Sequence, residues 1–531
     1  MSRQVSDRHV LSAVLWAETP LHIGAATAGF DTDMELVRDG RGRLLIPGTS
    51  LAGALRAALR RFDPALADDP WWGDAGDGHP HRGGAARIVV EDAPRVGAGD
   101  DDVSVRDGVA LDRRNASAGD HLLFSREVIY PGAYFQLHVG IDAAPGESDR
   151  GRLMLDAIID LLTRCGIDVG AAASRGLGRV RIHPVDDGKR SPHRRWVEHR
   201  DNPAGMLELL AGGPTQQEVT APADTEPDQG TLLIEIGWQP STAVMSMQAL
   251  ASSAVDTMPA VSVDPANSDQ LRLLLAGTGL AGAFSSRVER IARTLAAGSD
   301  GFDGEPDDLR RDALPGLREL FGSPGRGRAD RGVVSAVSFA DCLGKAPIDR
   351  TGWEGRVEGN RDVVPQSTAG MDDKQKDLVL TALAMGRDGL AVSTHNGIDR
   401  WTGGASDGLL FSVAEPKRAT EWEPLRLRVD VGLLERDPGR GAAGWALLLL
   451  GLKALTDGTV PLGGLVTRGL GSIVTDARKV TFTAGRGLPS TGPAAALARN
   501  RTLNAALHDT PLISMLNQAI AHAYPKKVTA A

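Results

Sequence analysis

The chain repeats one order of predicted elements, and this internal repeat most limits what it can fold into. Each half reads as strand, helix, strand, long polar excursion, strand, helix and strand, an order typical of a ferredoxin-like βαββαβ unit. Matched segments follow one another in the same order in both halves: residues 232–238 with the first strand, 276–284 with 47–55, 320–322 with 71–73, 337–341 with 88–92, 398–400 with 111–113, 410–411 with 123–124, 445–455 with 153–165, and 467–471 with 174–178. We therefore predict an α+β fold of two tandem ferredoxin-like (RRM-like) domains, each with a long thumb-like insertion.

Composition places the boundaries between these domains. The stretch 201–230 is rich in Pro, Gly and Asp and is predicted to be a linker. The first domain then covers residues 1–200, the second covers 231–485, and 486–531 forms a short helical tail. The second excursion, 344–393, is longer than the first, which surface loops tolerate.

Cysteines and apolar runs exclude several classes of protein. The two cysteines, Cys165 and Cys342, give neither a disulfide framework nor a zinc-site spacing. The N-terminus lacks the basic segment, apolar core and cleavage site of a signal peptide. The longest apolar run, 445–455, is too short to span a bilayer. We expect a cytoplasmic protein without a membrane partner.

The net charge of -9 argues against a general nucleic-acid binder, because such domains are commonly basic. It does not exclude a protein that grips RNA along one groove, since the local field decides this. Basic clusters occur at 113–114 and 189–200, and each also fits a solvated surface.

A Gly-preceded helix start recurs in both halves. In the first half, Leu51, Leu55 and Leu59 recur at helical spacing after Gly48, Thr49 and Ser50, whose hydroxyls are expected to cap the helix. Bare amides at such a start form a natural phosphate site, and Arg56 and Arg60 share one face of the helix. The second half offers Gly277 and Thr278 at the same place.

A second recurring motif ends the predicted loop before the last strand. The first copy, SRGLG, carries Arg175 and Gly176, and the second carries Arg468 and Gly469. Glycines allow a ligand to approach the backbone, and the arginine would add charge to a nest of amides. A tight loop between helix and strand is the alternative.

The excursions themselves contain paired motifs. Asp112-Arg113 and Asp399-Arg400 open them, and as isolated dipeptides these are surface salt-bridge residues. Phe124 and Phe411 are predicted to anchor the base of each excursion in the core rather than to stack on bases.

This layout resembles the RAMP superfamily, specifically the repeating backbone subunit (the seventh Cas family) of type III CRISPR effector complexes. The resemblance is carried by residues 21–24 (LHIG), Asp33, the strand run to Asp39, and residues 47–53 (PGTSLAG). Two such domains in one chain are similar to the fused double backbone subunits of some type III systems. In the family the excursion forms a thumb that wedges between guide and target bases, and the Asp at the place of Asp33 cleaves target RNA.

The family chemistry implies attack by the substrate's 2′-hydroxyl with help from a divalent metal. A carboxylate with an ordinary pKa of about 3.9 is a poor general base at neutral pH. Asp33 is therefore expected to position a hydrated Mg²⁺ or Mn²⁺, with Asp31 and Glu35 as neighbouring candidates. A solvated acidic loop is the alternative.

The second half is expected to be a weaker catalyst. Aligning Val263-Asp264 with Arg38-Asp39 places Met258 opposite Asp33, and a thioether does not bind a hard cation. In that register Asp256 falls opposite Asp31, where a small shift would bring it to the catalytic place. The helix also differs, since Ser285 falls at the place of Arg56 and Arg290 keeps the place of Arg61.

Three functions fit these observations. The first is a metal-dependent endoribonuclease subunit that binds crRNA, cleaves target RNA at Asp33, with Asp256 as the second catalytic candidate, and assembles with other CRISPR effector subunits. The second is a structural crRNA-binding subunit without catalysis. The third is a RAMP-type processing endonuclease, which normally uses a histidine. The residues predicted to contact RNA are Gly48, Thr49, Ser50, Arg56, Arg113, Arg175, Gly176, Gly277, Thr278, Arg400, Arg468 and Gly469.

Overall fold

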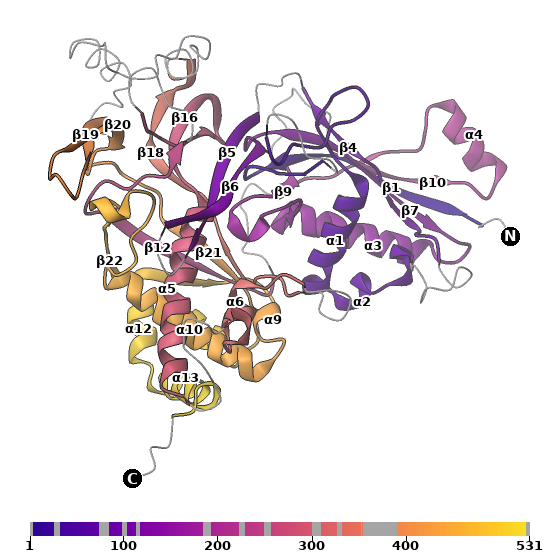
Figure 1. Ribbon diagram of the computed structural model, residues 1–531. Helices are drawn as coiled ribbons and strands as arrows, with labels where there is room; N and C mark the ends of the chain where they lie inside the picture. Colours follow the sequence, from indigo (N-terminus) through magenta and orange to yellow (C-terminus); the bar gives the residue numbers. More distant parts are fainter. Residues whose placement is uncertain are drawn as a thin grey trace.

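The computed structural model describes residues 4–25, 32–73, 84–97, 103–112, 117–183, 193–221, 229–248, 256–299, 310–325, 332–351, 353 and 390–526. The chain forms two units that lie side by side (Figure 1). The first unit runs from β1 to β11 and the second from β12 to α13.

The first unit is built on one antiparallel sheet. Its neighbouring strands run in the order β11-β10-β1-β7-β4-β2, with β3 also paired to β7 and β9 paired to β1 and β8. Its elements are β1 (Asp7–Ala17), β2 (Leu45–Ile46), α1 (Gly48–Phe62), α2 (Pro64–Ala67), η1 (Pro70–Trp72), β3 (Ile88–Val90), β4 (Ala93–Val96), β5 (Val103–Asp112), β6 (Ser117–Ile129), β7 (Tyr134–Ala143), α3 (Ser148–Asp160), the π-helical turn η3 (Leu161–Cys165), β8 (Ile167–Asp168), η4 (Ala173–Arg175), β9 (Arg179–Ile182), β10 (Arg194–His199), α4 (Pro203–Ala211) and β11 (Gln217–Glu218).

The second unit has a four-stranded sheet in the order β17-β21-β12-β22 and a smaller sheet of β15, β16 and β18. Its elements are β12 (Thr231–Pro240), β13 (Met247–Gln248), β14 (Met258–Pro259), β15 (Val261–Asp264), β16 (Asn267–Leu275), α5 (Gly277–Ala297), η5 (Arg311–Ala313), α6 (Leu317–Phe321), β17 (Val337–Phe339), β18 (Cys342–Asp349), β19 (Leu390–Ile398), β20 (Ala405–Pro416), β21 (Leu425–Asp430), α9 (Val431–Leu434), α10 (Pro438–Thr456), η7 (Val466–Arg468), β22 (Ile473–Ala484), α11 (Pro493–Asn500), α12 (Leu503–His508) and α13 (Thr510–Ala523).

Both units place their first strand in the same surroundings. In the first unit β1 lies between β7 and β9, with β3 on the far side of β7. In the second unit β12 lies between β21 and β22, with β17 on the far side of β21. The predicted α+β class is confirmed, because both units combine antiparallel sheets with helices.

Each unit has its own hydrophobic core. The stripe of Leu51, Leu55 and Leu59 on α1 is fully buried in the first core, as the spacing predicted. In the second unit α10 is apolar on nearly all sides and is buried along most of its length. The C-terminal part of the second unit forms α11–α13, and Leu503, Leu512 and Leu516 pack these helices into the second core.

Several element boundaries differ from the prediction. The first strand was predicted to reach Gly24, but β1 ends at Ala17, because the bend at Glu18 and Thr19-Pro20 interrupts the ladder. Proline has no amide to donate, so regular pairing stops there. The predicted linker 201–230 contains α4, which Asn202 caps through its bond to the amide of Gly205.

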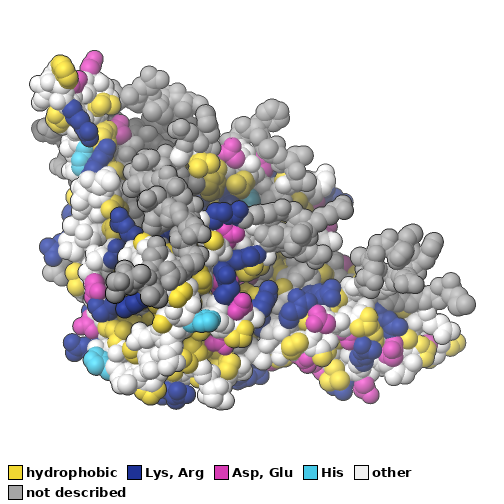
Figure 2. All heavy atoms as spheres, turned by 60° about the horizontal axis from the view of Figure 1, so that its bottom comes forward, with side chains coloured by type: hydrophobic (Ala, Val, Ile, Leu, Met, Phe, Trp, Pro, Cys, Tyr) yellow, Lys and Arg dark blue, Asp and Glu magenta, His cyan; other side chains and the backbone are white. Residues whose placement is uncertain are grey.

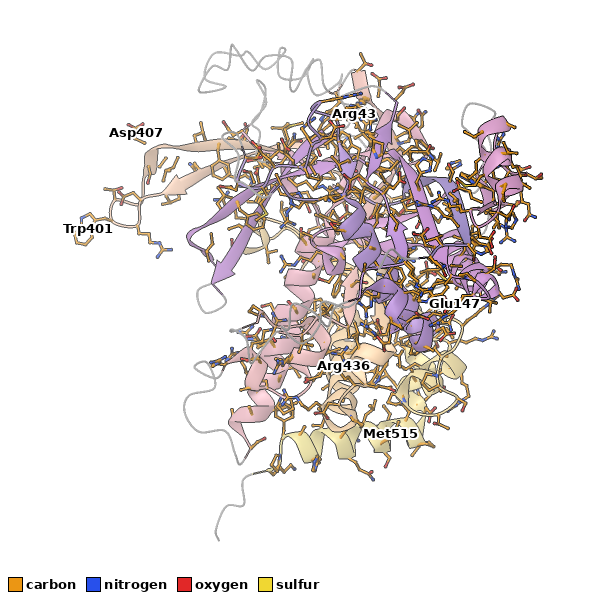
Figure 3. All side chains as sticks on the ribbon, turned by 90° about the vertical axis from the view of Figure 1, so that its right-hand side faces the viewer. Arg43, Glu147, Trp401, Asp407, Arg436 and Met515 are labelled. Atoms are coloured by element: carbon orange, nitrogen blue, oxygen red, sulfur yellow. The ribbon has the colours of Figure 1, made fainter. Side chains whose placement is uncertain are left out.

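Two long hairpins take the place of the predicted thumbs. The first hairpin is β5–β6 and the second hairpin is β19–β20, and each forms a two-stranded sheet of its own that is joined to the rest of its unit by isolated bridges. Figures 1 and 3 show the second hairpin projecting from the body, with Trp401 and Asp407 at its outer end. Most of the predicted long excursion 344–393 lies outside the described residues. In the described part of the chain, no helix is both long and apolar enough to cross a membrane.

Candidate functional site

Asp33 lies at the base of the first hairpin and is held there by one residue of β6. Its Oδ2 accepts hydrogen bonds from the Ser125 amide at 2.8 Å and the Ser125 hydroxyl at 3.0 Å. The Asp33 amide donates in return to Ser125 Oγ at 3.0 Å. The Asp33 side chain is exposed, so the carboxylate is fixed in direction while it still faces solvent.

Asp256 occupies the same position at the second hairpin. Its Oδ2 accepts from the amide and hydroxyl of Ser412 at 2.7 and 2.9 Å, and its own amide donates to Ser412 Oγ at 3.2 Å. The following residues also correspond, since Met34 forms a parallel bridge with Arg126 and Thr257 forms one with Val413. The structure therefore makes Asp256 the counterpart of Asp33.

This geometry corrects the sequence register that placed Met258 opposite Asp33. Met258 lies in β14 and its side chain is fully buried in the second core. The register failed because it was counted back from Val263-Asp264: Asp256 lies eight positions before Asp264, whereas Asp33 lies six positions before Asp39. The second half therefore has two more residues than the first between its aspartate and this reference pair.

The hydrogen bonds to Ser125 keep Asp33 ionised. The bond from the Ser125 amide, followed by that from its hydroxyl, lowers the pKa of Asp33 below its ordinary value. A second carboxylate lies beside it, because Asp107 on β5 pairs directly with Ser125 and so shares its face of the hairpin. Burial and the charge of Asp33 raise the pKa of Asp107. In the second hairpin Thr394 pairs with Ser412 at this place.

The described residues around Asp33 offer only a few oxygen ligands for a cation. Among the described residues there is no group of three or more His, Cys, Asp or Glu side chains arranged to hold a metal. Mg²⁺ is commonly bound by one or two carboxylates together with substrate phosphates and water. Asp33, with Asp107 beside it, supplies that smaller set, whereas Asp31 lies outside the described residues.

The helix starts do not offer the bare amides that were predicted. The Gly48 amide donates to Asp92 Oδ1 and the Gly277 amide donates to Asp341 Oδ1, both at 2.7 Å. These carboxylates already use the positive end of each helix and would repel a phosphate, so the predicted phosphate seat there is wrong. The N-cap positions also carry no side-chain cap, contrary to the prediction for Thr49 and Ser50. Thr49 and Thr278 are exposed at these starts, and their RNA contacts stay predictions.

The two SRGLG-type loops have the same backbone, and we name them Arg-Gly loop 1 (residues 172–178) and Arg-Gly loop 2 (residues 465–471). Gly176 and Gly469 have φ of 88° and 89°, and each loop begins with a non-glycine residue at positive φ. The amides of Arg175 and Arg468 donate to carbonyls at the start of their own loop. Because these amides close the turn, the predicted nest is replaced by a tight loop that presents an exposed arginine.

The arginines of these loops lie beside the hairpin bases. Burial, followed by the charge of nearby Arg175, lowers the pKa of Arg126 on β6. The guanidinium of Arg468 lies 4.3 Å from the ring centroid of Phe411. The Phe411 ring also stacks on the His395 ring, with 5.4 Å between the two ring centroids. Phe411 and Phe124 are half-buried and belong to neither core, so the prediction that they anchor the core is wrong.

The remaining predicted contacts are dispersed. Arg56 Nε donates to the Ala67 carbonyl at 2.8 Å and so ties α1 to α2. Arg400 is exposed in the turn of the second hairpin, where the Asp399 carboxylate accepts the amides of Trp401 and Thr402. Arg113 lies outside the described residues.

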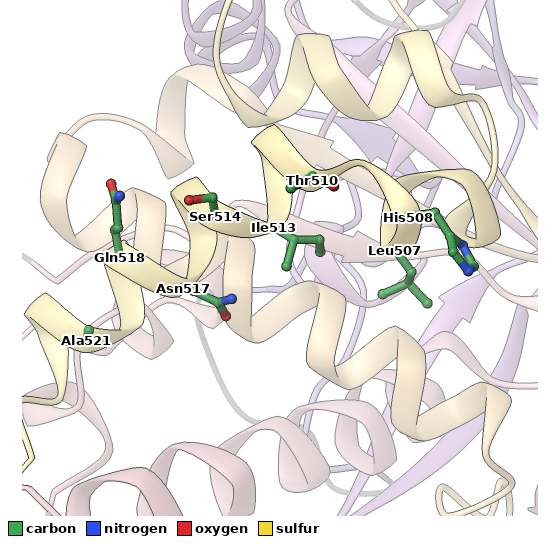
Figure 4. A pocket seen from close by; sticks show the side chains of 8 residues that line it. All are labelled: Leu507, His508, Thr510, Ile513, Ser514, Asn517, Gln518 and Ala521. Atoms are coloured by element: carbon green, nitrogen blue, oxygen red, sulfur yellow. The ribbon is translucent and has the colours of Figure 1, made fainter.

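Basic side chains do not collect into one field on the face shown in Figure 2, where they alternate with acidic and hydrophobic groups. A shallow cavity of about 640 Å³ runs along α12 and α13, lined by residues such as Leu507, Ile513 and Gln518 (Figure 4). None of the predicted site residues lines this cavity. The hairpin bases are therefore the candidate site.

Sequence reasoning missed three kinds of residue at this site. Ser125 and Ser412 carried a signal, because each directly follows the matched Phe124 or Phe411. Asp107 carried none, since its neighbours come from strand pairing. Trp401, whose side chain is 95% exposed at the tip of the second hairpin, follows the matched Asp399-Arg400 pair.

Comparisons with known proteins agree with this architecture. Residues 15–181 match the family model of the RAMP superfamily. A curated relative from Methanocaldococcus jannaschii, named CRISPR system Cms endoribonuclease Csm3, is 26% identical over an alignment that covers 33% of this chain and 79% of the relative.

A chain from a solved structure titled Type III-B Cmr-beta Cryo-EM structure of the Apo state is similar at 15% identity. The similarity covers 34% of this chain and 98% of that chain, with a TM-score of 0.28, which is too low to support an argument. The resemblance to the RAMP superfamily is confirmed over residues 15–181 by the family model, and the curated relative is a CRISPR protein.

Proposed function

Because residues 15–181 belong to the RAMP superfamily, we propose that this chain is a backbone subunit of a type III CRISPR effector that binds crRNA and cleaves complementary target RNA. Its two units are then two tandem ferredoxin-like RAMP domains, with the hairpins as thumbs. The observation that carries the proposal is the repeated Asp–Ser arrangement, Asp33 with Ser125 and Asp256 with Ser412. It gives each unit one carboxylate fixed at a hairpin base.

The proposed reaction is transesterification within the RNA strand. The 2′-oxygen bonds to phosphorus as the bond to the 5′-oxygen breaks, so the products are a 2′,3′-cyclic phosphate and a 5′-hydroxyl. The 2′-hydroxyl loses a proton and the leaving 5′-oxygen gains one. A group that fixes the RNA strand in line for this displacement accelerates it without forming a bond to the RNA.

The chain's own residues hold and orient the strand. Ser125 fixes one oxygen of Asp33 and keeps the carboxylate ionised, so Asp33 accepts a hydrogen bond or holds a cation rather than acting as a strong base. Arg175 and Arg126 place positive charge near the same hairpin base and offset the charge of the phosphates. When bound, a hydrated Mg²⁺ or Mn²⁺ would lower the pKa of its water and screen the developing negative charge.

The test is to map the cuts in a target RNA labelled at each end. Asp33→Ala should remove the cut made by the first unit, Asp256→Ala the cut made by the second, and the double variant both. Each lost cut should slow by about 100-fold or more, while guide and target binding persist. Asp33→Asn and Asp256→Asn serve as controls of the same size.

Two results would contradict the proposal. If both cuts survive in the double variant, the chain is a structural RNA-binding subunit and cleavage occurs elsewhere. If Asp256→Ala leaves both cuts intact, only the first unit is a nuclease. RNA extracted from the chain purified with its neighbouring subunits should show a discrete small length, and its absence would reject the proposed crRNA partner.

A further inference from the structure

The two units join through Arg-Gly loop 1 of the first and the start of α5 in the second. The η4 turn of that loop packs against β17 and α5. A methyl group placed on Gly176 would lie 2.9 Å from the Asp341 amide nitrogen, and one placed on Gly277 would lie 2.8 Å from the Arg175 carbonyl oxygen. The loop is therefore in tight contact with the helix start.

Three ion pairs surround this contact. Arg106 on the first hairpin donates to Asp341 Oδ2 at 2.8 Å, with the two side chains only 18% and 10% exposed. The other two pairs join Asp168 to Arg428 and Arg61 to Asp430, both at 2.5 Å. Asp341 thus binds the α5 start through one oxygen and the neighbouring unit through the other.

The first unit carries a surface that matches the α5 start, which is the part of the second unit that contacts Arg-Gly loop 1. Asp92 Oδ1 accepts from the Gly48 amide at the same 2.7 Å as Asp341 does from Gly277. A methyl group on Gly48 would meet Val90 and Glu91 of its own unit, just as one on Gly277 would meet Phe339 and Ala340. The Asp92 side chain is exposed, and we name Gly48, Thr49 and Asp92 the acceptor face.

The second unit carries only part of the surface with which the first unit contacts the α5 start. Arg-Gly loop 2 has the right backbone, and a methyl group on Gly469 would meet no described atom within 4 Å. By strand register Ser393 stands at the place of Arg106, because Ser393 pairs with Val413 as Arg106 pairs with Arg126.

The second ion pair is missing as well. Pro461 stands at the place of Asp168, since each precedes a residue whose amide donates to the carbonyl of the last glycine of its loop. Gly140 stands at the place of Arg428 by the register of β7 and β21. The third pair keeps its residue types, with Arg290 and Asp142 at the places of Arg61 and Asp430, although Asp142 also lies 3.8 Å from the Arg8 guanidinium of its own unit. A second copy of this chain would therefore reproduce one of the three pairs.

We propose that the acceptor face docks a different chain of the same fold, whose Arg-Gly loop seats on Gly48 and whose hairpin carries an arginine that pairs with Asp92. The acceptor face rejects a second copy of this chain, because Ser393 leaves Asp92 without its cationic partner as water is removed. A carboxylate desolvated without a partner opposes association, whereas one that meets an arginine supports it. Copies of this chain therefore do not continue one another head to tail, and the acceptor face of the first unit stays open for a chain that supplies the arginine.

The test uses the full chain without RNA, so its outcome is separate from that of the nuclease proposal. In sedimentation velocity the wild-type chain should stay monomeric across micromolar concentrations. Ser393→Arg should associate head to tail, with an association constant raised about tenfold or more. Ser393→Gln, which adds length without charge, should stay monomeric, and adding Asp92→Asn to Ser393→Arg should abolish the association.

A mixing experiment then imitates the different partner. The Ser393→Arg, Asp92→Asn double variant can insert but cannot accept, and the wild-type chain can accept but cannot insert. Each should be monomeric alone, and the mixture should form a 1:1 complex that grows no further. Wild-type assembly that Asp92→Asn abolishes would show that the partner is a second copy and overturn the proposal. Failure of both Ser393→Arg association and the 1:1 complex would also overturn it.

Discussion

The bases of the two hairpins share one aspartate–serine arrangement and differ in the charged side chains around it. Both hold an aspartate, Asp33 or Asp256, through the amide and hydroxyl of a serine on the second strand of the hairpin. The first base adds Asp107 and Arg126, whereas the second has Thr394 and Val413 at these places. The comparison teaches that the fixed carboxylate is the common requirement, while the charge around it varies between the units.

The arginine of the loop is used differently as well. Arg175 lies among other cations near the junction of the units, where it contributes to lowering the pKa of Arg126 and of Arg311. Arg468 instead lies on the face of Phe411 in the exposed second hairpin. A planar guanidinium on a ring keeps its N–H edge available for a phosphate.

The largest expected effect comes from replacing the serine that holds each aspartate. Ser125→Ala should slow the first cut by about tenfold to 100-fold, because Asp33 loses the hydroxyl that fixes it. The pKa of Asp33 should also rise part of the way toward its ordinary value, because the amide at position 125, the larger cause of the lowered pKa, remains while the hydroxyl is lost. The acid limb of the cleavage profile for that cut should therefore move to higher pH.

Ser125→Thr is the matched control, because it keeps the hydroxyl and should retain the wild-type profile. Ser412→Ala should slow the second cut and leave the first unchanged. If Ser125→Ala cuts at the wild-type rate with the same pH profile, the serine has only a structural role.

The next effect concerns the two loop arginines. Arg175→Gln and Arg468→Gln should each weaken RNA binding several-fold and reduce the salt slope by roughly 0.7 per lost contact on single-stranded RNA. Arg56→Gln is the control, since Arg56 Nε is bonded to the Ala67 carbonyl and should affect helix packing instead. Binding titrations at several salt concentrations measure this, and equal slopes in all three variants would remove both loops from the RNA path.

A smaller effect should follow from exchanging Asp107 and Thr394. The first cut should need less Mg²⁺ than the second, because Asp107 adds a carboxylate beside Asp33. Asp107→Asn should raise the Mg²⁺ concentration for half-maximal first cleavage several-fold, and Thr394→Asp should lower it for the second cut. Metal titrations of each cut measure this, and identical requirements in all variants would show that Asp107 is not part of the cation site.

The smallest effect concerns Asp168, which pairs with Arg428 at the junction of the two units. Burial alone would raise the pKa of Asp168, but Arg428, Arg179 and Arg61 outweigh it and lower the value to about 2. The depressed pKa stabilises the fold above the unfolded value of about 3.9, and this contribution is lost as pH falls from about 4 toward 2.

Asp168→Asn should therefore lower the melting temperature by a few degrees at pH 7 and by less near pH 2. Thermal unfolding of both proteins across this range measures the difference. A difference that stays constant with pH would show that the Asp168 charge does not stabilise the junction.

Local patterns predicted the elements that single segments specify. The leucine stripe of α1, the two Arg-Gly loops and the helical tail are found where the sequence indicated, because periodicity and glycine positions act over a few residues. The phosphate seat at Gly48 was wrong because its amide bonds to Asp92, which is distant in sequence. The register of Asp256 was wrong because the second half has two more residues between its aspartate and β15, and only the bonds to Ser412 identify the counterpart of Asp33.

By itself, the sequence determined that the chain contains the same order of elements twice and that Asp33 lies ahead of a helix beginning at Gly48. Tertiary structure alone decided which serine holds each aspartate, which carboxylate lies beside it, and where each loop arginine rests. Those contacts join residues of different strands and loops, so strand register and packing set them rather than any local preference. The junction of the two units follows the same rule, since Arg106 meets Asp341 only when the hairpin of one unit folds across the helix start of the next.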